Sequence, residues 1–203
     1  MNKVGHSLLA GLVLMGAAAG TANANLVING GFEDPALPYG SWTVFSSITG
    51  WSLTSGHSIE VQNHVAGSPY EGDQHIELDS YANSGMAQTI ATVAGQSYNL
   101  SFAYSPRPGV DASSNYINVF WNGSLLGSPT GTTSGDTSWT VYNYLVTAAS
   151  AASILEFSAS GTSDSLGGYI DDVKLVASSV PAPASLALLG LGLLGFSATR
   201  RKK

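Results

Sequence analysis

Residues 98–104 read Tyr-Asn-Leu-Ser-Phe-Ala-Tyr and alternate strictly between large apolar side chains and small or polar ones. Successive side chains of a β-strand point to opposite faces of the sheet, so one face of this strand carries only large apolar groups. That face comprises Tyr98, Leu100, Phe102 and Tyr104. The stretch therefore predicts a strand with one buried face.

Seven more segments rich in β-branched and aromatic residues lie between clusters of Gly, Ser, Asn and Pro. They are residues 58–62, 75–79, 86–93, 116–121, 137–147, 153–159 and 169–176. The span 25–179 shows no convincing helical period and no repeat of solenoid length. Eight or more short strands separated by turn signals predict an all-β fold, either a β-sandwich or a jelly roll.

The charge of the chain is distributed unevenly along its 203 residues. The formal net charge is −6, but between residues 25 and 179 all thirteen acids face only Arg107 and Lys174, which gives this span a charge of −11. Such an acidic surface repels phosphate backbones, so nucleic-acid binding is excluded for the folded part. The chain has no cysteine, so packing or a metal ion must supply what disulfides often supply in exported proteins.

Residues 1–24 have the features of a secretory signal peptide. Lys3 supplies the positive region, residues 8–19 the apolar run, and Ala22-Asn23-Ala24 the small-x-small cleavage site. We expect cleavage before Asn25, which leaves residues 25–179 as the β-sandwich domain.

Residues 180–203 form a second targeting segment. Pro181-Ala182-Pro183 precedes an uninterrupted apolar or small stretch, residues 184–199, and four basic residues end the chain. This arrangement resembles the PEP-CTERM sorting signal of Gram-negative bacteria, with Ala182 where the family has glutamate. The resemblance implies a short transmembrane helix, transient inner-membrane insertion, processing by an exosortase-type enzyme, and export to the cell surface or the extracellular matrix. The alternative is a plain tail anchor, because a short apolar helix with a basic end suits both.

The order of several motifs carries another resemblance. Residues 25–33 contain Asn-Gly-Gly-Phe-Glu, residues 87–90 and 94–102 follow in the middle, and residues 169–175 read Tyr-Ile-Asp-Asp-Val-Lys-Leu. This order resembles the galactose-binding-like jelly roll, which is shared by carbohydrate-binding modules of xylanases and by a plant cell-wall protein family. The resemblance implies a domain that binds polysaccharide or exopolysaccharide.

The same resemblance implies one structural calcium ion held by Glu33 and Asp171, with Asp172 as a weaker candidate. Calcium prefers six to eight oxygen ligands, and two carboxylates brought together in so acidic a domain repel unless a cation lies between them. The alternative is that these are solvated acids at a turn and a strand end.

Aromatic rings and a loop cation are the candidates for sugar binding. Trp51 and the pair Tyr142 and Tyr144, which share one face of a strand, could stack on a sugar ring, and Arg107 could clamp a ligand. The alternatives are that the tryptophan packs in the core and that Arg107 pairs with a nearby acid.

No defensible catalytic set is present in the sequence. Glu77 and Asp79 share one strand face about 7 Å apart, a separation that glycoside hydrolysis can use, and His75 begins the same face. The spacings of His57, His64 and His75 match no short zinc motif, and no Gly-x-Ser-x-Gly elbow is present. The sequence predicts an exported, non-catalytic polysaccharide-binding protein. A structural or adhesive matrix protein without a sugar site and a small polysaccharide-active hydrolase are the alternatives.

Overall fold

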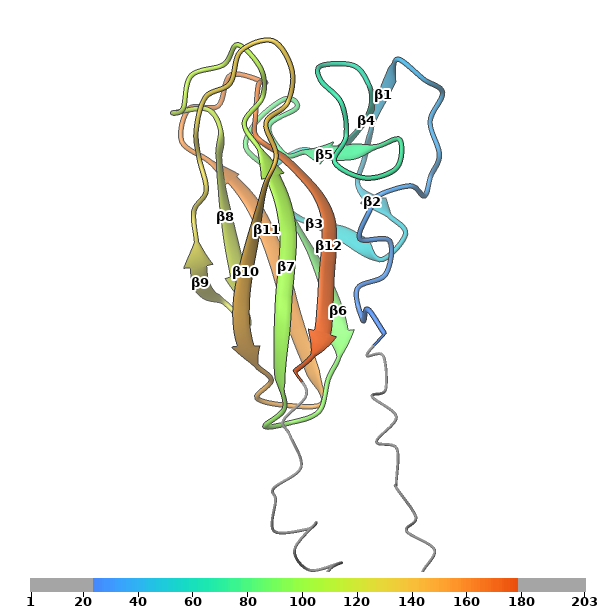
Figure 1. Ribbon diagram of the computed structural model, residues 1–203, viewed down its shortest axis with the longest axis vertical. Coiled ribbons are helices and arrows are strands. Elements are labelled where there is room, and N and C mark those ends of the chain that lie inside the picture. The colour runs from blue at the N-terminus through green and yellow to red at the C-terminus, as the bar shows by residue number, and fades with distance from the viewer. Residues whose placement is uncertain (1–23, 179–203) are drawn as a thin grey trace, which may run out of the picture.

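The computed structural model describes residues 24–178, which form twelve strands in two antiparallel six-stranded sheets packed face to face (Figure 1). Sheet A has the order β1 (Ser41–Phe45), β4 (Ile59–Asn63), β5 (His75–Glu77), β12 (Tyr169–Ala177), β7 (Ser97–Ser105), β10 (Thr140–Thr147). Sheet B has the order β2 (Ser47–Ile48), β3 (Trp51–Ser55), β6 (Gly85–Ala91), β11 (Ala152–Ser160), β8 (Tyr116–Trp121), β9 (Ser124–Gly127). None of these described residues forms a helix that could cross a membrane.

From β6 onward the chain passes repeatedly from one sheet to the other. Strands β6, β8 and β11 belong to sheet B, whereas β7, β10 and β12 belong to sheet A. This alternation is the jelly-roll arrangement, so the predicted all-β jelly-roll sandwich is confirmed.

All eight segments predicted as strands are strands, with ends that differ by at most three residues. The largest difference is at β10, which begins at Thr140 rather than at residue 137. The amide of Thr137 binds the side chain of Asp136 and the amide of Ser138 binds the hydroxyl of Ser105, so these residues belong to a loop. The sequence did not reveal β1, β2, β3 and β9, which are two to five residues long.

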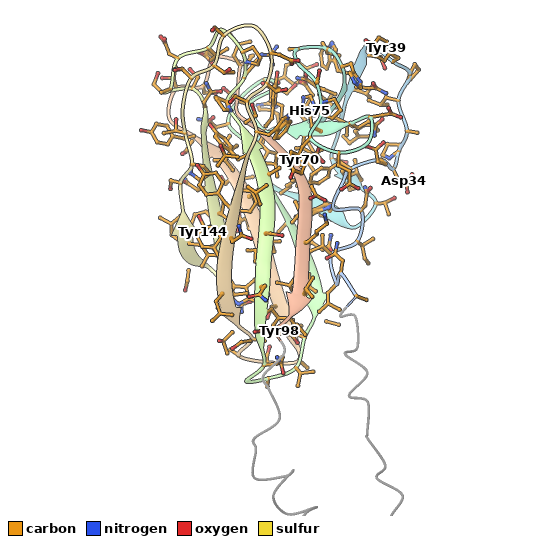
Figure 2. The ribbon with its side chains drawn as sticks, viewed as in Figure 1. Asp34, Tyr39, Tyr70, His75, Tyr98 and Tyr144 are labelled. Atoms are coloured by element: carbon orange, nitrogen blue, oxygen red, sulfur yellow. The ribbon has the colours of Figure 1, made fainter. Side chains whose placement is uncertain are left out.

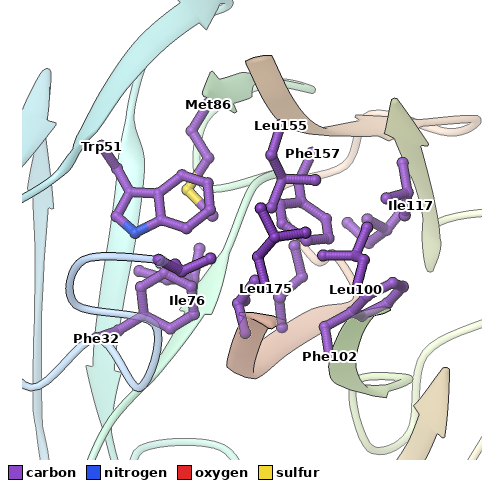
Figure 3. Close-up of a cluster of buried hydrophobic side chains, with 14 of the residues drawn as sticks. Phe32, Trp51, Ile76, Met86, Leu100, Phe102, Ile117, Leu155, Phe157 and Leu175 are labelled. Carbon is purple, nitrogen blue, oxygen red and sulfur yellow. The ribbon is translucent and has the colours of Figure 1, made fainter. Parts of the chain in front are cut away.

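The core fills the space between the two sheets (Figure 3). The four large side chains of β7 all point into it and are buried, as their alternation predicts. Phe102 meets Phe157 of the opposite sheet edge-on, with 5.1 Å between ring centroids. Full burial of a side chain of this size stabilises the fold by about 1.5–3 kcal/mol. Inward-facing rings of this kind therefore supply much of the free energy that holds the two sheets together.

The described chain begins and ends at the same end of the sandwich (Figure 1). Residues 25–32 are not a strand, but they lie beside β12: the Leu26 amide donates to the Leu175 carbonyl and the Val173 amide to the Gly30 carbonyl, both at 2.9 Å. A side chain on Gly30 would collide with the Val173 carbonyl, which explains the glycine there. The long loops that follow β4, β7, β9 and β11 gather at the opposite end (Figure 1).

Candidate functional site

The candidate site lies on the outer face of sheet A, where β4, β5 and the start of β12 meet. Residues 64–74, here called the covering loop, cross this face between β4 and β5. The loop is fixed by backbone contacts: the Tyr169 hydroxyl donates to the Ala66 carbonyl at 3.1 Å, and the Trp139 indole N–H to the Ser68 carbonyl at 2.9 Å. This part of sheet A is therefore buried on both faces.

A network of buried polar side chains lies beneath the loop. Ile59, Val61 and Ile76 point into the core, so their strand neighbours Glu60, Gln62, His75 and Glu77 point outward, and all of them are buried. Strand pairing sets Glu60 opposite Glu77 and Gln62 opposite His75. The Gln62 amide nitrogen donates to Glu60 Oε1 at 2.8 Å and to Glu77 Oε2 at 2.6 Å. One amide thus bridges two carboxyl groups.

Arg107 completes this network from the loop after β7. Its guanidinium forms an ion pair with Glu77 and lies over the Tyr169 ring, 5.9 Å from the centroid. Burial raises the pKa of Glu77 to about 8, with Glu60 and Asp79 adding to the rise, while Arg107 and the Gly167 amide oppose it. Of the two roles considered for Arg107, pairing with a local acid is the one that the structure shows.

His75 is a buried residue of this network whose side chain has no hydrogen bond within the described residues. It is fully buried, and neither ring nitrogen has a hydrogen-bond partner within residues 24–178. The side-chain amide oxygen Oε1 of Gln62, which lies opposite His75 in the strand pairing, has none there either. Burial lowers the pKa of His75 to about 3, so its ring is neutral at ordinary pH. Buried polar atoms without a partner are uncommon and costly, and a cluster of three of them indicates a place where a polar ligand or water binds.

Aromatic rings surround His75 and line the surface above it. Its ring contacts Tyr169, with 4.3 Å between centroids, and Trp139, with 5.8 Å. The Trp139 ring meets the Tyr70 ring edge-on at 6.1 Å. Tyr70 is 44% exposed and lies at the same end of the molecule as His75 (Figure 2).

Two further exposed rings extend this surface across β1. Trp42 lies opposite Gln62 in the strand pairing, on the same outer face, and is 47% exposed. Tyr39 is 81% exposed and stacks on His64, with centroids 4.9 Å apart and planes at 29°. We call Tyr39, Trp42, Tyr70 and Trp139 the aromatic rim.

The three rings proposed from the sequence lie elsewhere. Trp51 is 1% exposed and packs in the core, where its indole N–H donates to the Asn29 carbonyl, so its assignment as a ligand-binding ring is wrong. Tyr142 and Tyr144 do share one face, but it is the core side of β10. They stack on Phe102 at 5.6 and 6.2 Å and are half-buried, not an exposed pair.

Glu33 and Asp171 both hold the covering loop. Glu33 Oε1 accepts the amides of Asp73 and Gln74 at 2.8 and 3.0 Å. The buried Asp171 carboxylate accepts three amides, from Tyr70, Glu71 and Asp172, at 2.6–3.0 Å. The two carboxylates therefore anchor the two sides of one five-residue segment, residues 70–74.

The donor set partly suits a hard cation such as calcium. Burial raises the pKa of Asp171 to about 7, which marks a carboxylate whose negative charge is poorly compensated. Asp172 lies at a β-bulge with a φ of 48° and forms an ion pair with Lys174 at 2.6 Å, so its charge is already balanced. Within residues 24–178 no three His, Cys, Asp or Glu side chains gather around one point, so backbone carbonyls would have to complete a calcium shell.

The residues considered for catalysis and zinc binding are also placed. Asp79 is buried and accepts the Ser163 hydroxyl and the Asp164 amide, so it and Glu77 each have their own partners. His75 is fully buried beneath the covering loop. His64 Nδ1 contacts Asn63 Oδ1 at 2.8 Å and the ring supports Tyr39, whereas the His57 amide binds Ser84 Oγ at 3.0 Å.

Several residues of the site were not singled out from the sequence: Glu60, Gln62, Tyr39, Trp42, Tyr70 and Trp139. The alternation of 58–62 does place Glu60 and Gln62 on one face, opposite Ile59 and Val61. That pattern is also typical of a strand with a solvated outer face, so it contains no sign that residues 64–74 cover it.

Comparisons with known proteins relate the chain to large and small relatives. It is 32% identical over 162 residues to a multifunctional-autoprocessing repeats-in-toxin of Vibrio cholerae, which is 76% of this chain and 3% of the toxin. It is 30% identical over 118 residues to the Arabidopsis thaliana protein DUF642 L-galactono-1,4-lactone-responsive gene 2, which is 53% of this chain and 32% of that protein. The chain thus spans only a small part of the curated relatives that it matches.

A solved structure with a related sandwich is a family 35 carbohydrate binding module from Clostridium thermocellum. The TM-score is 0.46 with 14% identity, over 68% of this chain and 99% of the module. At the other end of the chain, residues 179–202 match the PEP-CTERM protein-sorting motif, although they lie outside the described residues. The expected sorting signal is therefore confirmed, and it indicates that this is an exported protein.

Proposed function

We propose that this exported protein is a non-catalytic surface or extracellular-matrix protein that binds a polysaccharide at the aromatic rim. The observation that carries the proposal is the position of unpartnered polar atoms of His75 and Gln62, beside the half-buried Trp139 ring and the exposed Trp42 ring respectively. A sugar ring needs both kinds of contact, a flat apolar surface for its C–H groups and a few fixed polar groups for its hydroxyls.

The residues have separate roles in this proposal. Trp42 and Tyr70 offer ring faces at the surface, and Tyr39 on its His64 support extends that surface toward a longer chain. His75, neutral at ordinary pH, can both accept and donate a hydrogen bond to hydroxyl groups. Because His75 is fully buried, a sugar hydroxyl reaches it only when the Trp139 ring or the covering loop shifts.

We further propose a structural calcium ion held by Glu33 and Asp171. The ion would supply the positive charge that the buried Asp171 carboxylate lacks and would fix residues 70–74, which carry Tyr70. Its role would be to hold the covering loop in place, not to activate a substrate.

The proposed binding is tested with the exported protein on a glycan array, followed by calorimetry with each glycan that binds. Trp42→Ala and His75→Phe should each weaken binding at least about tenfold, because one removes a stacking surface and the other the polar atoms. Tyr116→Ala removes an exposed ring on sheet B and serves as the matched control. Full binding by both rim variants would place the site elsewhere.

The glycan array and an assay for released reducing sugar separate the two alternative functions from polysaccharide binding. A matrix protein without a sugar site would bind no glycan on the array. A small hydrolase would release reducing sugar from a polysaccharide, and the Glu77→Gln variant would lose that release.

We also propose that an exosortase-type enzyme processes the C-terminal motif after transient insertion in the inner membrane. Pro181 and Pro183 stand directly before the apolar segment in the sequence, and proline is poorly tolerated inside a helix. Replacing Pro181 and Pro183 by alanine should leave insertion intact and block processing. The intact mass of the extracellular protein measures this, and a full-length C-terminus retained in the membrane of an exosortase-bearing host would indicate a plain anchor.

A further inference from the structure

Strand β10 forms the longest open edge of the sandwich. The four edge strands of the two sheets are β1, β2, β9 and β10, with five, two, four and eight residues. Residues 140–147 read Thr-Val-Tyr-Asn-Tyr-Leu-Val-Thr, without charge, proline or glycine. Natural sheets block their edges with short strands, charges, prolines or bulges, and β10 has none of these protections.

Nothing in residues 24–178 pairs with the free side of β10. Its backbone ladder runs only to β7, over eight residue pairs from Thr140 to Thr147. The Thr147 carbonyl accepts the Trp121 indole N–H at 3.0 Å, so the open part of the edge is residues 140–146. Asn143 is the central residue of that part.

The side chains of β10 are symmetric about Asn143. On the outer face, Val141 and Leu145 lie two residues to either side of it and are 44% and 70% exposed. In an antiparallel pair of two copies centred on Asn143, Val141 of each copy lies opposite Leu145 of the other. On the other face, Tyr142 lies opposite Tyr144 of the second copy.

Charge also favours a second copy at this edge. The domain carries a charge of −11 between residues 25 and 179, so most contacts between two copies bring acids together. An edge of eight uncharged residues is the place where two such domains can meet with little repulsion. Because β10 has no charged residue, it offers no ion pair to a charged partner.

We propose that two copies of this chain associate through antiparallel pairing of β10 with β10, centred on Asn143, which joins the two A sheets into one twelve-stranded sheet. The interface is isologous, as a twofold dimer requires. It is independent of the aromatic rim, which lies at the loop end of the sheet.

Asn143→Cys tests the register directly, because the natural chain has no cysteine. Residues directly opposite in an antiparallel pair have Cβ atoms about 4.5–5.5 Å apart, which small shifts bring into disulfide range. The exported full-chain variant should therefore form a covalent dimer under mild oxidation. Thr89→Cys, exposed on the central strand β6, is the control and should remain largely monomeric. Equal cross-linking of the two variants would overturn the proposed register.

Leu145→Lys tests the association itself by sedimentation equilibrium. A lysine on each copy at this edge should weaken the dimer at least about tenfold, whereas Leu125→Lys on the short edge strand β9 should leave it unchanged. All variants are produced in a host without an exosortase and keep residues 179–203, so association through that segment would persist in Leu145→Lys. A wild-type protein that is monomeric at all accessible concentrations, or a dimer insensitive to Leu145→Lys, contradicts the proposal. Glycan binding by Leu145→Lys is expected to be unchanged.

Discussion

The outer faces of the two sheets differ although both belong to one sandwich. On sheet B the outward side chains of the central strands, such as Thr89 and Ile154, are exposed. On sheet A the corresponding side chains of β4, β5 and the start of β12 are as buried as the core, and most of them are polar. Sheet B shows that the sandwich does not need a second buried layer on its outside.

The extra layer on sheet A has an energetic cost. Burying charged or polar groups is unfavourable unless each is paired, and an apolar layer of the same size is often as stable or more stable. Glu77 is paired with Arg107 and with the Gln62 amide nitrogen. Within residues 24–178, Gln62 Oε1 and both ring nitrogens of His75 have no partner. The layer therefore favours a role in recognition over a role in stability.

Among changes that distinguish the outer face of sheet A from that of sheet B, Arg107→Ala is expected to have the largest effect on stability. This change leaves the buried Glu77 without its cation, and unfolding by urea at about pH 9, where Glu77 is mostly ionised in the natural protein, should show a loss of about 3 kcal/mol. We expect the lower end of the usual range because the pKa of Glu77, already about 8, lets the carboxyl take up a proton. On sheet B, Thr54→Ala removes the donor to Glu156 Oε1 at a solvated position and should cost less than about 0.5 kcal/mol. Equal losses would mean that the buried layer is no different from an ordinary surface.

The next effect in size concerns calcium. At a concentration of one hundred times the dissociation constant, an ion that binds only the native state stabilises it by about 2.7 kcal/mol, so the melting temperature should fall on addition of EDTA. Glu33→Ala and Asp171→Ala should abolish the difference between calcium and EDTA, whereas Asp172→Asn should keep it, because Lys174 already balances Asp172. A wild-type melting curve that EDTA does not move would leave these carboxylates as anchors of the loop alone.

The buried acids of sheet A predict a loss of stability as the pH rises. The folded-state pKa values of Glu77, about 8, and Asp171, about 7, lie above their ordinary values near 4, so the folded state holds protons that the unfolded chain has released. His75 opposes this fall slightly near pH 6.5, because its folded-state pKa is about 3 whereas the unfolded ring, with an ordinary pKa of 6.5, is still half protonated there. Between pH 6.5 and 8 in EDTA, stability should therefore fall by about 2 kcal/mol.

Glu77→Gln isolates the part of this pH dependence that comes from the buried network. The variant should flatten the fall between pH 7 and 8 and leave the Asp171 contribution below pH 7 in place. A wild-type protein that gains stability over the same interval would contradict the assignment of raised pKa values to these carboxyls.

The smallest effect on stability is expected at the aromatic rim. Tyr39→Ala removes a ring that is largely in solvent and stacks on the His64 ring, so the free energy of unfolding should change by less than about 0.5 kcal/mol. The same variant should weaken glycan binding several-fold under the proposed function. A large loss of stability would show that the Tyr39 ring holds the chain before β1 in place.

The sequence was sufficient for the sandwich because the alternation of strands such as β7 depends only on neighbouring residues. The opening Asn-Gly-Gly-Phe-Glu motif lies beside β12, where the Gly30 carbonyl accepts the Val173 amide. The site could not be predicted in the same way, because it depends on where residues 64–74 lie. The burial of Trp51 could not be predicted either. In a strand as short as β3, no sequence pattern distinguishes a core tryptophan from an exposed one.

The aromatic rim and the C-terminal end of β12 lie at opposite ends of the sandwich. Strand β12 starts beside the site at Tyr169 and ends at Ala177, immediately before the sorting motif. Its nine residues span about 30 Å, so the rim stands roughly that distance from the point where the chain leaves the sandwich. Whatever holds the chain by its C-terminal segment therefore holds it by the end opposite the rim. A polymer strand approaching from the surroundings would meet the rings of Tyr39 and Trp42 before it met the attachment point.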